Sequence, residues 1–301
     1  MLAVLSSGLS GCRQQEPNSP TSASVEGNPE GSAEPTTPFL TRRNTYETQL
    51  RERGPAPAKY RDHPPPGHIT EVTYPSGELE LRAWLQTPGW GSGQSPALVY
   101  FHGDFAFGPD DMQVVEPFVE AGFVVMTPML RGENGNPGDF ELLWGEVDDG
   151  RAAIQWLAQQ PDINPKRIYA FGHSIGGGVA AMLSLYPELP LRTTGSCGGI
   201  YVPETFQRWA KSERNSKLVR FDASDPRETQ LRVLGPNVPW MVHRHVAYVG
   251  DDDPWFVDNA AAVEARAWEH GKPFELVMVP GTHMSSLEPA LEAFLGLALV
   301  P

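Results

Sequence analysis

The chain has 301 residues, with 37 acidic and 23 basic side chains and a formal net charge of -14. A length near 300 allows one large or two ordinary domains with a sizeable core. The strong negative charge argues against nucleic-acid binding, which needs a basic surface to displace phosphate counterions. The sequence has no apolar run of about 18 residues, so an ordinary transmembrane helix is not expected.

The first twelve residues are typical of a secretory signal. Residues 1–12 form a short apolar run that ends in small residues. The last four, Leu9-Ser10-Gly11-Cys12, resemble the bacterial lipobox, in which the cysteine is diacylated and the chain is cut before it. No Lys or Arg precedes the run, which departs from that pattern. We expect lipidation at Cys12 and a protein anchored to the membrane of the bacterial cell envelope, facing the periplasm or the exterior. Without a working signal the protein would be cytoplasmic.

A polar segment separates this signal from the body of the chain. Residues 13–38 are rich in Pro, Ser, Thr, Glu and Gly, and cannot bury enough apolar surface to offset their ordering entropy. We therefore expect a disordered tether there. Residues 39–68 contain a short helical candidate at 44–53 and a turn-rich Pro-Pro-Pro-Gly segment. We interpret them as an arm that packs on a domain spanning 69–301.

From residue 69 onward, predicted strands alternate with predicted helices. The strand signals lie at 69–74, 79–87, 97–101, 123–129, 167–172, 194–200, 241–249 and 274–279. The helix signals lie at 112–121, 141–160, 175–186, 257–270 and 286–297. This alternation predicts an α/β fold, a mostly parallel sheet with helices on both faces. Residues 201–240 are too long for a routine connection, so we expect an insertion that forms a small cap.

One motif carries the strongest chemical signal. Gly172-His173-Ser174-Ile175-Gly176 matches the nucleophile-elbow pattern. It directly follows a predicted strand and directly precedes a glycine-rich helix start, which is the context that an elbow needs. An ordinary glycine-rich turn or a phosphate-binding turn is the alternative. The context favours a serine whose hydroxyl projects from the carboxyl edge of the sheet.

A nucleophilic serine needs a base, and the base needs an acid that orients it. His283 follows the last predicted strand, and the carboxyl ends of parallel strands meet at one edge of the sheet. His283 is therefore expected to reach Ser174. Asp251, Asp252 and Asp253 end the preceding strand at the same edge, and one of them is expected to orient the histidine.

The order of these residues resembles that of the α/β-hydrolase superfamily, in which Ser, Asp and His follow one another along the chain. In that superfamily the acid is usually the third residue after the glycine that ends the strand. The resemblance selects Asp253, with Asp251 as second choice. His102-Gly103-Asp104 resembles the superfamily's His-Gly-Gly motif. This implies an oxyanion hole made by the backbone N–H groups of Asp104 and Ile175.

The chain from about 71 to 297 resembles the prolyl-oligopeptidase family catalytic domain and its dienelactone-hydrolase-like neighbours. The most specific stretches are 144–149, 155–157 and 162–168, which lead into the elbow. The resemblance implies hydrolysis of a small peptide or carboxylic ester through an acyl-enzyme, without a cofactor. Only about 68 residues precede the domain, too few for the propeller that many oligopeptidases of the family carry. Esterase activity is therefore as strongly expected as peptidase activity.

Two other interpretations compete with this one. His243 and His245 share a face of a predicted strand, but no third ligand is evident, so no metal site is predicted. The second function is a catalytically inactive hydrolase fold that serves as a surface binding protein. Asp104 favours it, because the residue replaces the glycine of the motif and puts a carboxylate near the developing anion.

Overall fold

The computed structural model describes residues 35–89 and 93–300. The expected signal at 1–12, its lipidation site Cys12, and all but the end of the expected tether at 13–38 lie outside these residues. Within the described ranges, no helix is both long enough and apolar enough to cross a membrane.

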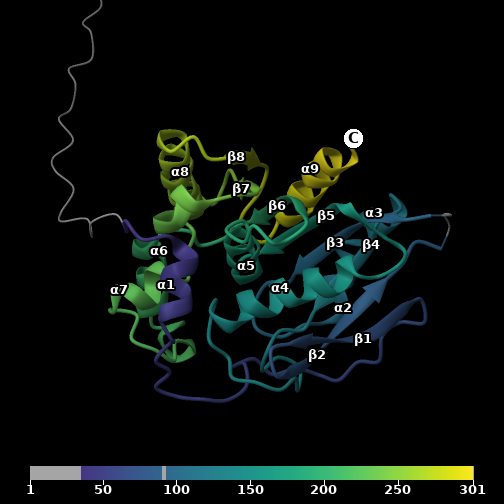
Figure 1. Cartoon of the computed structure of the whole chain (residues 1–301), viewed down its shortest axis with the longest axis horizontal. Helices are drawn as coiled ribbons and strands as arrows, with labels where there is room; N and C mark the ends of the chain where they lie inside the picture. Colours follow the sequence, from purple (N-terminus) through teal and green to yellow (C-terminus); the bar gives the residue numbers. More distant parts are fainter. Residues whose placement is uncertain (1–34, 90–92, 301) are drawn as a thin grey trace, which may run out of the picture. The chain divides into compact units, whose positions relative to one another are not determined.

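Eight strands form a single sheet in the order β1-β2-β4-β3-β5-β6-β7-β8 (Figure 1). They are β1 (Ile69–Ser76), β2 (Leu79–Gln86), β3 (Ser95–Phe101), β4 (Val124–Pro128), β5 (Ile163–His173), β6 (Leu191–Cys197), β7 (Arg244–Gly250) and β8 (Phe274–Val279). The β1–β2 and β2–β4 pairs are antiparallel, and every pair from β4 to β8 is parallel. The mostly parallel sheet of the predicted α/β-hydrolase fold is confirmed.

Helices cover both faces of this sheet. The helices are α1 (Phe39–Thr45), α2 (Pro109–Gln113), α3 (Glu116–Glu120), α4 (Gly145–Ala158), α5 (Ile175–Leu183), α6 (Pro203–Lys211), α7 (Pro226–Gln230), α8 (Pro254–Glu269) and α9 (Leu287–Leu299). Helices α4, α5 and α8 pack on one face, whereas α3 and α9 pack together on the other (Figure 1). The helices cover the faces of the sheet, and the carboxyl ends of the parallel strands lead into loops.

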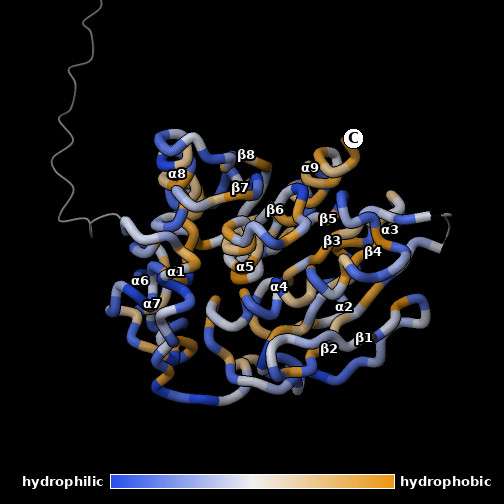
Figure 2. Tube along the Cα trace, viewed as in Figure 1, coloured by the Kyte–Doolittle hydropathy of each residue, from blue (hydrophilic) through white to orange (hydrophobic). Residues whose placement is uncertain are grey.

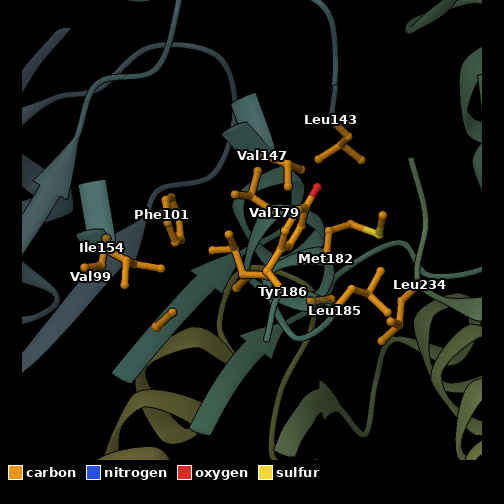
Figure 3. Packing of buried hydrophobic residues seen from close by; sticks show 14 of the residues in the cluster. Val99, Phe101, Leu143, Val147, Ile154, Val179, Met182, Leu185, Tyr186 and Leu234 are labelled. Carbon is orange, nitrogen blue, oxygen red and sulfur yellow. The ribbon is translucent and has the colours of Figure 1, made fainter. Parts of the chain in front are cut away.

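The strand period of two divides the core into two layers. In β5, Ile168 and Ala170 belong to the cluster under α4 and α5, whereas Tyr169 and Phe171 belong to the cluster with α9. Both sets are fully buried, as expected for a central parallel strand. Figure 3 shows the first layer, with side chains from α4, α5 and β3 interdigitated. Figure 2 shows hydrophobic residues gathered along the central strands, while α6 and α7 are largely hydrophilic.

Three predicted helices were wrong in their extent. The helical candidate at 44–53 overlaps only the last two residues of α1, and the chain leaves the helix at Tyr46. The helix predicted at 112–121 is two short helices, because Pro117 lacks an N–H and its ring clashes with the carbonyl four residues earlier. The helix predicted at 141–160 begins only at Gly145, since Leu142 and Leu143 adopt left-handed backbone angles.

A buried carboxylate explains the late start of α4. Glu146 accepts hydrogen bonds from the amides of Glu141, Leu142 and Trp144, at 2.7, 3.1 and 3.1 Å. These three amides turn toward one side chain and so cannot continue a helix. Burial raises the pKa of Glu146 to about 7, against the opposing effect of these hydrogen bonds.

Residues 201–240 lie outside the sheet and hold α6, α7 and two 3-10 helices, η1 (Ser216–Leu218) and η2 (Gly235–Trp240). The segment 39–56 packs against them. Fully buried Arg232 forms an ion pair with Glu228, whose carboxylate also accepts hydrogen bonds from Tyr46 and Thr48 at 2.8 and 2.9 Å. The extended segment after α1 thus supplies partners to a charge pair that burial would otherwise make costly.

Candidate active site

Ser174 occupies a sharp turn between β5 and α5. Its backbone angles, φ 53° and ψ -114°, are unfavourable for a residue with a side chain. The close approach of the helix requires glycine at Gly172 and Gly176. A Cβ on Gly172 would lie 2.0 Å from the Gly176 oxygen, and one on Gly176 would lie 2.2 Å from the Phe101 oxygen. The glycines of the motif therefore allow α5 to begin directly behind the serine.

The three residues expected to act together do lie together. His283 Nε2 lies 3.1 Å from Ser174 Oγ, and His283 Nδ1 lies 3.0 Å from Asp253 Oδ2. Ser174 follows β5, Asp253 precedes α8 after β7, and His283 follows β8. The carboxyl edge of the sheet from β5 to β8 thus brings together residues that are up to 109 positions apart. Each distance is within hydrogen-bonding range for a nucleophile, a base and an orienting acid.

The loop after β7 separates its three aspartates. Asp253 is partly buried and contacts the His283 ring. Asp251 is exposed, and its Oδ1 accepts a hydrogen bond of 2.8 Å from the amide of Gly281, two residues before the histidine. Asp252 is exposed as well. Asp251 therefore holds the backbone of the histidine loop, whereas Asp253 holds the imidazole.

Two further residues fix the plane of the imidazole. The Phe256 ring stacks on His283 at a centroid distance of 4.4 Å. Gly198, with φ 63°, lies on the ring, and a Cβ there would be 2.6 Å from His283 Cε1. Sequence analysis missed both residues. The only available signal was the Gly198-Gly199 pair, which fell inside a strand predicted at 194–200, whereas β6 ends at Cys197.

His173, the residue before the serine, contacts the histidine loop and not the Ser174 hydroxyl. Its Nε2 donates to the backbone carbonyl of His283 at 3.0 Å. Burial, with a smaller contribution from His283, lowers the pKa of His173 to about 4. A neutral His173 therefore acts as a fixed donor that ties the histidine loop to the elbow.

The two candidate oxyanion donors are the amides of Ile175 and Asp104. Ile175 is the first residue of α5, where an amide has no acceptor within the helix. Asp104 follows Gly103, on which a Cβ would lie 2.8 Å from His173 Nδ1. The turn at Asp104 is left-handed, with φ 63°. Both residues therefore flank the serine.

The loop that carries Asp104 is anchored on both sides. Before it, His102 Nε2 lies 3.1 Å from Glu133, and its Nδ1 lies 2.8 Å from the Gly103 carbonyl. Burial alone would lower the pKa of His102, but the charge and hydrogen bond of Glu133 raise it to about 9. After it, the amide of Asn134 bonds both the N–H and the C=O of Phe107, each at 2.8 Å.

The histidine pair considered for a metal has other partners. His245 is fully buried and bonds Thr194 and Ser196, each at 2.8 Å, and burial lowers its pKa to about 3. His243 donates to the carbonyl of Tyr186 at 2.9 Å. Across residues 35–89 and 93–300, no group of three or more His, Cys, Asp or Glu side chains is arranged to hold a metal ion.

Residues 28–212 match a family described as X-Pro dipeptidyl-peptidase (S15 family). The matched segment contains Asp104 and Ser174, whereas Asp253 and His283 lie beyond its end. The chain is also 31% identical over 139 residues to an uncharacterized peptidase, YtmA, of Bacillus subtilis, which covers 44% of this chain and 49% of the relative. An uncharacterized Mycobacterium tuberculosis protein is 29% identical over 137 residues, covering 42% and 48%. The chain thus spans about half the length of the curated relatives it matches.

Several solved structures share the fold. The acylaminoacyl peptidase of Pyrococcus horikoshii superimposes with a TM-score of 0.61 at 16% identity, covering 76% of this chain and 40% of that one. A puromycin hydrolase gives 0.67 at 18% identity, covering 77% and 39%. An esterase of Pyrococcus furiosus gives 0.62 at 15% identity, covering 81% and 96%. At these identities the likeness establishes the α/β-hydrolase fold alone.

Proposed function

Because this chain belongs to the X-Pro dipeptidyl-peptidase (S15) family, we propose that it is a serine hydrolase that cleaves a small peptide or carboxylic ester. The observation that carries the proposal is the chain of contacts from Asp253 through His283 to Ser174, at 3.0 and 3.1 Å. The strained backbone of Ser174 is a second support, because such strain persists where a fold needs it.

In the proposed acylation step, Ser174 Oγ attacks the substrate carbonyl carbon while His283 Nε2 takes its proton. Asp253 keeps the Nδ1–H of the imidazole directed toward itself and stabilises the imidazolium that forms. The amides of Asp104 and Ile175 donate to the oxyanion. The imidazolium then gives its proton to the departing amine or alcohol, and the acyl group remains on Ser174.

Deacylation repeats the same steps with water. His283 takes a proton from the water that attacks the acyl carbonyl, and returns it to Ser174 Oγ as the acid leaves. No metal or cofactor enters this scheme. The alternative function, a catalytically inactive binding protein with the same fold, requires that the Ser174 hydroxyl is not activated.

The family and the YtmA relative favour a peptide as substrate, while the match to the Pyrococcus esterase covers 96% of that esterase and shares its fold. A fluorophosphonate probe tests activation, because only an activated serine reacts with it. We expect labelling of the wild-type protein and none of Ser174→Ala. An unlabelled, folded wild type would support the binding-protein alternative. A panel of p-nitrophenyl esters and peptidyl p-nitroanilides then separates esterase from peptidase activity.

We also propose that the full-length protein is lipidated at Cys12 and held at the membrane of the bacterial envelope. The support is the lipobox-like Leu9-Ser10-Gly11-Cys12 and the polar segment behind it. Several acyl chains hold a protein stably, whereas one binds only marginally. Mass spectrometry of protein from a bacterial host tests this. An unmodified peptide that runs through Cys12 would contradict it, and Cys12→Ser is expected to release the protein from the membrane.

A further inference from the structure

Asp104 combines three properties that no other residue of the site has. It is exposed, it adopts a left-handed backbone with φ 63°, and it replaces the second glycine of the His-Gly-Gly motif. Its side chain makes no hydrogen bond or ion pair with any residue that the structure describes. Asn134, which also has a positive φ, is by contrast buried and bonded to Phe107 through both amide atoms.

Covalent geometry places this unpaired carboxylate close to the reaction. Only two carbons separate an aspartate carboxyl carbon from its own amide nitrogen, so the oxygens stay within about 5 Å of that nitrogen. An oxyanion accepting from the same amide lies about 2.9 Å away. The carboxylate is therefore at most about 8 Å from the oxyanion, which is no further than the Debye length of about 8 Å at physiological salt.

A fixed anion at this distance opposes the reaction of a neutral substrate. Negative charge develops on the substrate oxygen in the transition state, and the carboxylate repels it. The cation two residues earlier, His102, offers no compensation, because it is buried and already paired with Glu133. A positive charge carried by the substrate would remove this penalty and contact Asp104 directly.

We propose that Asp104 selects substrates whose acyl residue carries a free α-ammonium group, that is, aminoacyl amides or esters. This inference rests on the proposed serine-hydrolase function. The α-ammonium is two bonds from the scissile carbonyl carbon, so it lies beside the oxyanion and within reach of the Asp104 carboxylate. An X-Pro dipeptidyl group carries its ammonium one residue further away, so the proposal departs from the family description at this point.

Two substrates that differ only in this charge provide the test. We compare kcat/KM for L-alanine p-nitroanilide and its N-acetyl derivative, with wild-type protein and with Asp104→Asn. Asparagine keeps the size, the backbone N–H and the tolerance of a positive φ. We expect the wild type to prefer the free amine by at least about tenfold, and the variant to lose at least about tenfold of that preference. The two rates should move in opposite directions, lower for the free amine and higher for the acetylated substrate.

Matched controls separate this effect from a general loss of charge or fold. Asp110→Asn removes an exposed carboxylate six residues later and should leave the preference unchanged. Raised salt should shrink the wild-type preference, since the charges involved face solvent. If the asparagine variant does not fold, Asp104→Gly replaces it, because glycine adopts a positive φ without strain. It should show the same two changes, a lower kcat/KM for the free amine and a higher one for the acetylated substrate.

Three results would overturn the inference. They are an unchanged preference in Asp104→Asn, an equal fall of both rates, and a change confined to glycyl-prolyl p-nitroanilide against its N-acetyl form. The last would put the recognised ammonium on the preceding residue. Failure of the proposed function looks different, because a wild-type protein that neither reacts with fluorophosphonate nor hydrolyses any of the four substrates is not a serine hydrolase.

Discussion

Two histidine–carboxylate pairs lie near the carboxyl edge of the sheet, and their geometry is nearly the same. His283 Nδ1 is 3.0 Å from Asp253, and His102 Nε2 is 3.1 Å from Glu133. The surroundings differ. The His283 side chain is 28% exposed and its other nitrogen reaches the Ser174 hydroxyl, whereas the His102 side chain is 2% exposed and its other nitrogen meets the Gly103 carbonyl.

This difference shows that the third partner and the access of solvent decide what such a pair does. The Nδ1–H of His102 donates a hydrogen bond to a backbone carbonyl, which is too weak a base to take the proton, so this histidine only fixes the loop before Asp104. The second nitrogen of His283 faces a hydroxyl that can lose a proton, so the same pairing can serve as a base. The predictions below separate the two pairs by activity and by stability.

The largest effect is expected at the serine. Ser174→Ala should reduce kcat by roughly 10⁴ to 10⁶, because loss of one residue of a catalytic triad removes most of the triad's contribution to the rate. The fold should stay intact. Alanine also keeps a Cβ at the strained φ, so the strain there is unchanged. Steady-state kinetics with an active substrate and a thermal unfolding curve measure the two properties. Full activity in a folded variant would exclude Ser174 as the nucleophile.

The acid comes next. Asp253→Asn should lower kcat by about 10⁴, because an amide favours the wrong imidazole tautomer. Asp251→Asn is the matched control two residues away, and its effect should be much smaller since the Asp251 side chain accepts from the Gly281 amide and not from the imidazole. Parallel kcat measurements of the two variants decide the assignment. If Asp251→Asn had the large effect, Asp253 would be misassigned.

A substitution in the buried His102–Glu133 pair should lower the free energy of unfolding. Glu133→Gln removes the partner of an enclosed histidine, and breaking such a pair costs roughly 3–5 kcal/mol of unfolding free energy. The carboxylate also accepts the amide of Leu130 at 2.8 Å, which glutamine can still do through its carbonyl. Denaturant unfolding of the variant at neutral pH measures the loss. A variant as stable as the wild type would show that the His102–Glu133 contact contributes little.

The pH dependence of stability carries the signature of the same pair. The pKa of His102 is raised from 6.5 to about 9 in the fold, so its stabilisation is complete below pH 6.5 and is lost as the pH rises toward 9. Unfolding free energies measured from pH 6 to 9.5 should therefore fall for the wild type. Glu133→Gln should flatten this fall. Equal slopes for the two proteins would mean that other groups cause it.

Sequence patterns were sufficient for the framework and for the residues at the strand ends. The strand–turn–helix context around Ser174 and the order of Asp253 and His283 follow from local patterns and from the geometry of parallel sheets. The residues at which helices begin and end were harder to predict. The helix predicted from residue 141 starts at Gly145 because Glu146 turns back to bind three amides, a contact that hydrophobic spacing does not reveal.

Residues that support the site through space were not predictable in the same way. Gly198 and Phe256 lie against His283 from two different elements, and nothing in their own neighbourhoods of the sequence points to the histidine. The helical candidate at 44–53 was wrong for a related reason. Tyr46 and Thr48 bond a carboxylate about 180 residues away, so a tertiary contact overrides the local preference.

The smallest effect on activity is expected from deletions at the N-terminus. Deletion of residues 1–38 should leave kcat/KM unchanged, because every candidate catalytic residue lies beyond position 100. Deletion of residues 1–50 is the informative contrast. It removes Phe39, 1% exposed and packed edge-on to Tyr186. It also takes three hydrogen-bond donors from Glu228, namely the hydroxyls of Tyr46 and Thr48 and the amide of Gln49. Loss of a buried phenylalanine alone costs roughly 3–5 kcal/mol, so Tm should fall steeply in the longer deletion and stay constant in the shorter one. If the shorter deletion abolished hydrolysis in a folded protein, residues before 39 would have to take part in the active site.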